Sequence, residues 1–268
     1  MEGTLTPLPG LIDTHCHLDA AEFEPDRDAV AAAARAAGVE RIVVPAVERN
    51  NFSAVERMQA AYPGCSHALG IHPMYVDRAV DGDLDVLRSR LERGGAVAVG
   101  EIGLDFFVEG HDQPRQERWF AAQLELAREF GLPVLLHIRR AQDIVLKHLR
   151  RIRVPGGIAH AFNGSREQAD VFLRLGFRLG FGGTMTYERA TRVRELAATL
   201  PIEAIVLETD APDIPPSFAR GRRNDPANLL PIAHALAALR GIAPEEAAAA
   251  TRRNALEVLP RLADAAAS

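Results

Sequence analysis

Short apolar runs alternate with amphipathic segments along almost the whole chain. The runs predict buried strands at GLIDTH, ERIVVPAV, SHALGIH, AVAVGEI, LPVLLHI, GGIAHAF, FRLGFGG and AIVLETD. The segments between them predict helices over residues 26–37, 52–61, 83–93, 115–130, 141–151, 165–175 and 187–199, followed by two more at 226–240 and 244–258. Gly38, Gly131 and Gly176 stand where helices should end, and Ser165 stands where one should begin.

This alternation predicts the fold class. Strands that alternate with helices form right-handed βαβ units and a parallel sheet. Eight such repeats predict a closed (β/α)8 barrel of the TIM type, and a doubly wound open sheet is the alternative. No linker divides the chain, so residues 1–268 are expected to form a single domain, with the proline-rich segment 211–226 as a long loop over one face of the barrel.

Polar residues collect where the predicted strands end. Barrel strands are buried on both faces, so polar side chains within them need an explanation. The carboxyl ends of the strands meet at one face of a barrel, which is where barrel enzymes hold their active sites. The residues at these ends are His15, His17, His72, Glu101, His137, His160 and Asp210.

The chemistry of this set indicates metal binding. Side chains alternate along a strand, so His15 and His17 should face the barrel axis, while Cys16 should face the layer beneath the helices. Imidazole and carboxylate groups suit Zn, Mn, Fe, Ni or Co better than Ca, and Mg is a further candidate. Two carboxylates and the four histidines of ligand grade exceed what one tetrahedral zinc needs, so they predict two divalent ions that share a bridging carboxylate. These histidines are His15, His17, His137 and His160. The alternative is that some of these histidines are core residues bonded to backbone carbonyls.

Composition limits the compartment and the partners. The formal net charge is −5 and the isoelectric point is about 6.0, so the protein has no overall basic field for nucleic acid. A nucleic-acid substrate would need a local basic rim, for which the candidates are Arg139, Arg140, Arg220, Arg222 and Arg223. The two cysteines suit a reducing compartment, and neither a signal peptide nor a membrane span is recognised, so a cytoplasmic location is expected.

Sequence motifs spread over nearly the whole chain resemble those of one family. They are IDTHCHLD, GIHP, GEIGLDF, LPVLLHIR, IAHAFNGS, LGFGGTMTY, VLETDAP, RRNDPANL and TRRNALEVL. In order and spacing they are similar to the TatD-like metal-dependent hydrolases of the amidohydrolase superfamily. Details such as VPAVE and GGTMTYERA are most similar to a proteobacterial branch.

The resemblance implies a metal-dependent barrel that hydrolyses phosphodiesters, commonly as a deoxyribonuclease. Neither a membrane nor a stable protein partner is expected. It implies that His15, His17, Glu101 and Asp210 hold one metal ion. Glu101, His137 and His160 would hold the second, with Glu101 as the bridge. Asp210 would also orient or deprotonate the attacking water, so Asp210 and Glu101 are the expected catalytic residues. The family often has tyrosine where this chain has Phe106, which removes one hydroxyl from the expected substrate site.

Five further residues are candidates for contact with the substrate. Arg139 lies two residues beyond His137 and could hold a phosphate through two hydrogen bonds, or could form a surface ion pair. Arg223 and Asn224 could clamp the substrate, or Asn224 or Asp225 could cap the helix after Pro226. His72 could contact substrate or fix the turn before Pro73. Asp105 could orient a metal ligand or cap a loop.

Three functions are compatible with these residues. The first is a metal-dependent phosphodiesterase acting on DNA or another phosphodiester. The second is a metal-dependent amide or ester hydrolase, acting for example on aminoacyl-tRNA, because the same centre can attack a carbonyl. The third is a metal-binding scaffold without turnover, which Asp210 argues against because a purely structural site needs no water-bearing position.

Overall fold

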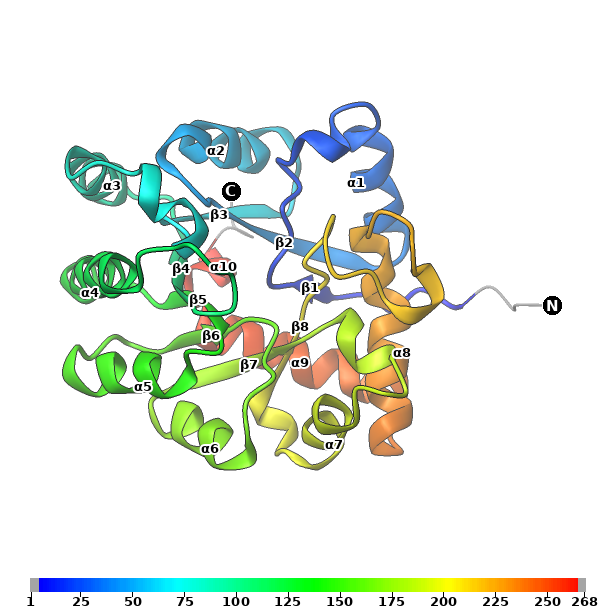
Figure 1. The fold of residues 1–268 in the computed structure, drawn as a ribbon. Helices are drawn as coiled ribbons and strands as arrows, with labels where there is room; N and C mark the ends of the chain where they lie inside the picture. The colour runs from blue at the N-terminus through cyan, green and yellow to red at the C-terminus, as the bar shows by residue number, and fades with distance from the viewer. Residues whose placement is uncertain (1–4, 265–268) are drawn as a thin grey trace.

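Eight parallel strands form one sheet in the structure, a computed structural model that describes residues 5–264. Each strand pairs with the next along the chain, and Figure 1 shows the helices arranged outside the ring of strands. The strands are β1 (Leu11–Asp13), β2 (Val39–Pro45), β3 (Cys65–Leu69), β4 (Ala98–Asp105), β5 (Val134–Arg139), β6 (Gly157–Ala159), β7 (Phe177–Phe181) and β8 (Ile205–Leu207).

Helices connect the strands much as the apolar spacing predicts. The α-helices are α1 (Arg27–Ala36), α2 (Phe52–Ala61), α3 (Gly82–Glu92), α4 (Gln113–Glu129), α5 (Gln142–Arg151), α6 (Arg166–Arg174), α7 (Thr191–Thr199), α8 (Leu229–Arg240), α9 (Pro244–Val258) and α10 (Arg261–Asp264). Short 3-10 helices lie at Ala21–Phe23, Arg49–Asn51, Pro73–Arg78, Gly183–Thr186, Ile202–Ala204, Ser217–Ala219 and Pro226–Asn228. Ser165 caps α6 as predicted, because its side chain accepts a hydrogen bond from the Gln168 backbone.

Backbone hydrogen bonds bring the last strand back to the first. The amide of Thr14 donates to the carbonyl oxygen of Leu207 at 3.1 Å, and the amide of Asp210 donates to that of His15 at 2.8 Å. The sheet is therefore a nearly closed barrel, which confirms the predicted fold and not the open-sheet alternative.

One end of the barrel is plugged and the other is open. The barrel interior is filled by a cluster of strand residues such as Val43, Leu135 and Val206, which pack against Val258 and Leu259 at the end of α9. Figure 1 shows α9 and α10 behind the barrel. Because Asn254 of α9 donates to the carbonyl of Ile205, where β8 begins, this helix covers the amino ends of the strands. The carboxyl ends are left for the loops that carry the candidate site.

The strands differ from the prediction mainly at the open end. β1, β6 and β8 are shorter than predicted, since the chain leaves the sheet just before His15, His160 and Glu208. β4 is longer: it continues to Asp105, so Glu101 lies inside the strand and does not close it. No helix within residues 5–264 is long and apolar enough to cross a membrane.

Candidate metal centre and active site

Glu101 lies at the centre of the predicted ligands, and its two carboxylate oxygens face different groups. Its Oε2 lies 3.1 Å from Nε2 of His15 and 3.6 Å from Nε2 of His17. Its Oε1 lies 3.2 Å from Nδ1 of His137 and 3.5 Å from Nε2 of His72. The pairing of β4 with β5 shifts register between Val99 and Ile102, and such irregularities commonly re-aim a side chain beside an active site.

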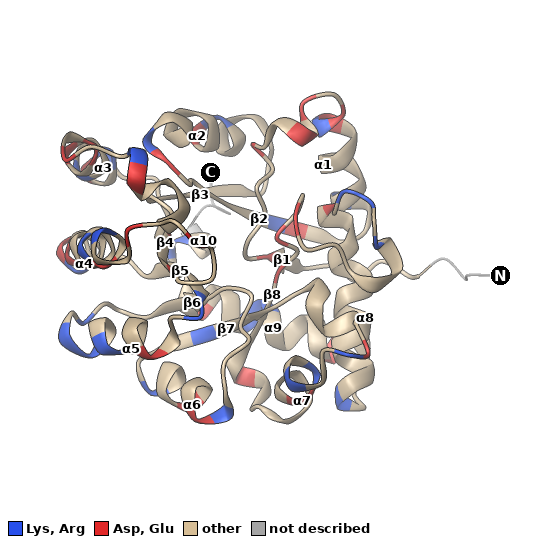
Figure 2. Cartoon of the chain, viewed as in Figure 1, with Lys and Arg blue, Asp and Glu red and all other residues tan. Residues whose placement is uncertain are grey.

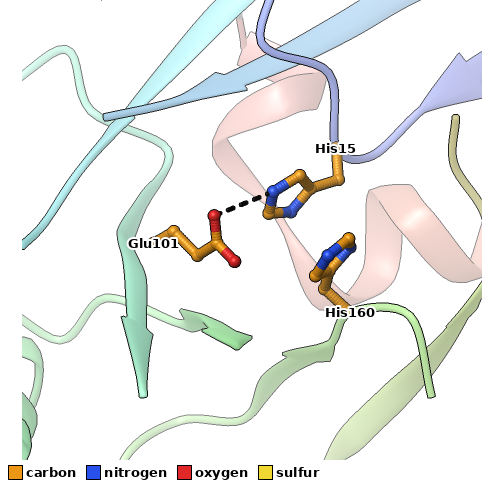
Figure 3. Close-up of side chains that lie close together, drawn as sticks. All are labelled: His15, Glu101 and His160. Atoms are coloured by element: carbon orange, nitrogen blue, oxygen red, sulfur yellow. Dashed lines mark hydrogen bonds and ion pairs between the residues drawn. The ribbon is translucent and has the colours of Figure 1, made fainter. Parts of the chain in front are cut away.

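Asp210 joins this cluster from the loop after β8. Its Oδ1 lies 3.8 Å from Nε2 of His15 and 3.7 Å from Nε2 of His17, and its Oδ2 lies 3.6 Å from Nε2 of His160. The rings of His15 and His160 stack with their centroids 3.8 Å apart. Figure 3 shows His15, Glu101 and His160 directed toward one another. All six ligands predicted from the sequence therefore lie together at the open end of the barrel.

The spacing of these atoms suits a shared cation better than a hydrogen-bond network. Five of the nitrogen–oxygen separations just given lie between 3.5 and 3.8 Å, beyond ordinary hydrogen-bond length. Of these contacts, only those of Glu101 with His15 and His137, at 3.1 and 3.2 Å, are within hydrogen-bond distance. Among residues 5–264, three sets lie close enough to hold an ion: His15 with His17 and Asp210, His15 with Glu101 and His160, and His72 with Glu101 and His137.

This grouping differs in one respect from the arrangement that the family resemblance implies. The resemblance groups His160 with Glu101 and His137, whereas here His160 groups with His15 and Glu101. The structure adds His72 to the set around His137, with the two rings 4.2 Å apart. His72 also fixes its turn, because its Nδ1 accepts a hydrogen bond from the Met74 amide. The structure thus supports the turn-fixing interpretation of His72 and adds a candidate ligand role, while its contact with substrate stays a prediction.

The electrostatics of the cluster also favour a bound cation. Burial acts to raise the pKa of Glu101, but His15, His72 and His137 outweigh it and hold that pKa well below its usual range. Burial acts to lower the pKa of His160, but the carboxylates of Glu208 and Asp210 raise it to about 10. The negative potential that holds a proton on His160 would equally attract a divalent ion.

Two histidines are kept neutral, which is the form that binds a metal. Burial, reinforced by the neighbouring His160, lowers the pKa of His15. Burial and the neighbouring His137 lower the pKa of His72 to about 4. Both imidazoles can therefore offer a lone pair at neutral pH.

Asp105 holds His137 from the side opposite Glu101. Its Oδ2 lies 2.9 Å from Nε2 of His137, and its Oδ1 accepts hydrogen bonds from the amides of Phe107 and Val108. Burial acts to raise the pKa of Asp105, but these bonds outweigh it and lower the pKa. The contacts of Asp105 are compatible with both alternative roles, orienting a candidate ligand and capping a loop, while its contact with substrate stays a prediction.

The candidate site opens into a cavity of about 1070 Å³. Its lining includes the candidate ligands His17, Glu101, His137, His160 and Asp210, together with Arg139. The side chain of Arg139 is 44% exposed, its Nη1 lies 3.8 Å from Oδ2 of Asp105, and its guanidinium lies over the Phe107 ring. Arg139 is thus restrained but open to the cavity.

Comparison with known proteins identifies the family. A family model described as TatD related DNase matches residues 12–260. The chain belongs to the TatD-related DNase family.

Relatives in this family match over most of their length. The metal-dependent hydrolase YjjV of Escherichia coli K12 is 42% identical over 246 residues, covering 91% of this chain and 95% of YjjV. The crystal structure of E. coli YjjV superposes with a TM-score of 0.91 at 40% identity, covering 94% of this chain and 99% of that one. A 3'-5' ssDNA/RNA exonuclease TatD from Klebsiella pneumoniae is 36% identical over 239 residues, covering 86% of this chain and 90% of that protein. This TatD-family chain is therefore a metal-dependent hydrolase that acts on ester bonds.

The TatD-family barrel uses two buried carboxylates that the sequence analysis did not place in the site. Glu208 lies 3.0 Å from Nδ1 of His160 and accepts a hydrogen bond from the Ala161 amide. A Cβ on Gly180 would lie 2.1 Å from a Glu208 oxygen, so glycine leaves the room for this carboxylate. Asp13 accepts hydrogen bonds from the amides of His15 and Thr209, and burial raises its pKa to about 8. The signal for Glu208 was its position two residues before Asp210, on the same face of an extended chain.

Arg223 and Asn224 do not line the cavity. The two terminal guanidinium nitrogens of Arg223 donate hydrogen bonds to the carboxylate of Asp26, and the guanidinium lies over the Phe23 ring. The Asn224 side chain is wholly buried and donates to the carbonyls of Thr209 and Asp213. The structure supports the capping interpretation for this segment, and Asp225 supplies the cap by accepting a hydrogen bond from the Ala227 amide.

Cys16 faces the layer that was predicted for it. It is fully buried in the apolar cluster between the barrel and the helices, and it belongs to none of the ligand sets. Burial raises its pKa well above the ordinary value for a thiol. Alternation along the chain therefore separates it correctly from His15 and His17.

Proposed function

We propose that this protein is a phosphodiesterase that cuts nucleic-acid strands, DNA first among them, through a centre of two divalent metal ions. The observation that carries the proposal is the position of the Glu101 carboxylate, whose two oxygens face two different sets of histidines. A carboxylate in that position can bridge two ions. The exonuclease name of a TatD relative supports a nucleic-acid substrate.

Six residues would hold the ions in this proposal. They are His15, His17, Glu101, His137, His160 and Asp210, with His72 as a further donor beside His137. When bound, the ions would lower the pKa of an adjacent water toward neutrality and offset the negative charge of the phosphoryl oxygens.

The protein side chains would do the remaining work. Asp210 lies at the edge of the cavity and is the base proposed to take the proton of the attacking water. Asp105 holds the His137 ring in one orientation through the contact between Oδ2 of Asp105 and Nε2 of His137. Arg139 would hold a phosphate oxygen at the mouth of the cavity.

The proposal is tested with purified protein loaded in turn with Zn, Mn, Mg, Ni or Co. Hydrolysis is measured on a single-stranded oligodeoxynucleotide, on bis-p-nitrophenyl phosphate and on an aminoacyl ester. We expect turnover of both phosphodiesters and little of the ester. Turnover of the ester alone would favour the amide or ester hydrolase and reject the phosphodiesterase.

Variants of Glu101 and Asp210 test whether the two carboxylates have the different roles proposed for them. Asp210→Asn keeps the shape of the side chain but cannot take a proton, so it should retain much of its metal and lose roughly 10²–10⁴-fold in kcat. Glu101→Ala should lower metal stoichiometry, measured by elemental analysis, as well as activity. Asp213→Asn is the matched control, because Asp213 lines the same cavity but belongs to none of the ligand sets. Near-wild-type turnover of Asp210→Asn would show that Asp210 is not the base.

A further inference from the structure

A second groove opens beside the candidate site, at the loops that follow β5 and β6. It has a volume of about 530 Å³, within the range of roughly 300–1,000 Å³ typical of small-molecule sites. Arg139 and Asn163 line both this groove and the cavity of the metal centre, so the two spaces adjoin at these residues. A chain-like substrate held at the metal centre could therefore continue into the groove.

The groove is basic in a protein that is acidic overall. Arg139, Arg140 and Arg192 line it, and no aspartate or glutamate is among its lining residues in the described chain. Two carboxylates border it, and each bonds a neutral lining side chain: Asp143 accepts from Gln168, and Glu167 accepts from Ser165. The net charge of the whole chain is −5, so this concentration of arginine is a local feature.

Two arginines of the groove, Arg139 and Arg140, are positioned by an aromatic ring, and none of the three has a close carboxylate partner among the described residues. The guanidinium carbons of Arg139 and Arg140 lie 4.1 and 4.6 Å from the centre of the Phe107 ring. Phe107 is 45% exposed, so it forms part of the surface of the groove. Within the described residues, neither Arg140 nor Arg192 forms an ion pair with a carboxylate. Guanidinium groups arranged in this way suit successive phosphates.

We infer that this groove is a second substrate subsite, which binds the phosphates of the nucleotides next to the scissile bond in a single-stranded nucleic acid. The inference rests on the proposed function, and it adds Arg140, Arg192 and Phe107 to the substrate contacts. A single strand is the occupant because its backbone can bend from the cavity into the groove. The residues recognise the backbone and therefore carry no sequence preference.

Substrate length provides the test. Steady-state kinetics of the metal-loaded enzyme are compared on bis-p-nitrophenyl phosphate, which reaches only the metal centre, and on oligothymidylates of two and six nucleotides. Arg140→Ala and Arg192→Ala should each lower kcat/KM on the hexanucleotide roughly tenfold and leave the small diester within about twofold. The dependence of kcat/KM on salt should also weaken, by about 0.7 in log–log slope per lost contact.

Two controls separate charge from position. Arg150→Ala removes an exposed arginine near the far end of α5, outside the groove, and should change neither substrate. Arg140→Lys keeps the charge and should recover part of the loss on the hexanucleotide. Equal losses on the small diester and the hexanucleotide, or no loss on either, would overturn the subsite.

The design distinguishes failure of the subsite from failure of the proposed function. If the wild-type enzyme cuts no phosphodiester, the phosphodiesterase proposal fails, and the uncut fluorescein-labelled hexanucleotide is then titrated with the same variants by fluorescence anisotropy. Weaker binding by Arg140→Ala and Arg192→Ala than by Arg150→Ala would still support the groove. Equal binding by all of them would reject it.

Discussion

Two loops at the open end of the barrel carry arginines that look alike in the sequence, but the structure uses them differently. The loop after β5 begins with Arg139 and Arg140, whose guanidinium groups lie over an exposed phenylalanine at the border of the cavity. The loop after β8 carries Arg223, whose guanidinium is paired with Asp26 on the outside of the barrel. Figure 2 shows basic segments on both sides of the barrel mouth, beside β6 and in the loop next to α1.

The difference shows that the partners of an arginine decide its role. Arg139 has one distant carboxylate neighbour, whereas Arg223 has a bidentate pair and a backbone carbonyl of Glu22 as acceptors. The two terminal nitrogens of Arg223 are thus already engaged in three hydrogen bonds, which leaves fewer donors for a phosphate. This difference supports the proposal that the loop after β5 contacts the substrate, whereas the loop after β8 supports the segment that carries Asp210.

The largest effect that tests this comparison is expected at Asn224. Asn224→Ala should lower the free energy of unfolding by about 2–4 kcal/mol, because it removes a wholly buried amide and leaves the carbonyls of Thr209 and Asp213 without their donor. Since this segment also positions Asp210, metal content should fall too. Denaturant unfolding and elemental analysis provide the measurements.

Asn228→Ala is the matched control for Asn224. The side-chain amide of Asn228 donates one hydrogen bond, to Oδ1 of Asn224. That oxygen still accepts a hydrogen bond from the Asp225 backbone amide in the variant, so the loss of unfolding free energy should be smaller than for Asn224→Ala. A variant Asn224→Ala with unchanged stability but lost activity would contradict the comparison and would restore Asn224 as a substrate contact.

The sequence was sufficient to predict the fold and the clustering of the candidate ligands, for physical reasons. Parallel strands bring their carboxyl ends together, so the sequence alone predicts that His15, Glu101 and Asp210 lie at the same end of the barrel. The alternation of apolar and polar positions likewise assigned Cys16 to the opposite face from His15. These inferences depend on local periodicity, which the sequence displays directly.

The rest depended on contacts between distant parts of the chain. Arg223 and Asp26 are 197 residues apart, and no local pattern pairs them. Glu208 was overlooked because its role depends on the space that Gly180 leaves on a neighbouring strand. The grouping of His160 with His15 similarly follows from the stacking of two rings from different strand ends.

The next largest effect is expected at Arg139. Arg139→Ala should lower kcat/KM at least tenfold on bis-p-nitrophenyl phosphate and on oligonucleotides alike, because this guanidinium borders both the cavity and the groove. The melting temperature of this variant should change little, since the Arg139 side chain is 44% exposed and its Nη1 lies 3.8 Å from Oδ2 of Asp105. A loss of stability with unchanged kinetics would show that Arg139 is only a surface ion pair.

A smaller effect is expected at Phe107. Phe107→Ala should lower kcat/KM on a hexanucleotide about threefold and spare the small diester, because the ring orients two guanidinium groups by contacts worth about 0.5–1 kcal/mol each at exposed sites. Phe218 is the matched control from the loop after β8, since it is similarly exposed, at 46%. If Phe218→Ala lowered kcat/KM on the hexanucleotide by the same factor, the loops after β5 and β8 would not differ in their contact with the substrate.

The smallest effect is expected at Arg223, where Arg223→Ala should leave the kinetics on every substrate unchanged. The melting temperature of the variant should lie no more than about 2 °C below that of the wild type at pH 7, because the ion pair between Arg223 and Asp26 lies at the surface. The hydrogen bonds from Arg223 lower the pKa of Asp26. A carboxylate whose folded pKa is depressed stabilises the protein above its unfolded pKa, about 3.9, and that contribution is lost as the pH falls through the folded value. The difference in melting temperature between wild type and variant should therefore shrink as the pH drops below about 4. A loss of activity in Arg223→Ala at unchanged stability would return this arginine to the substrate and remove the distinction between the two loops.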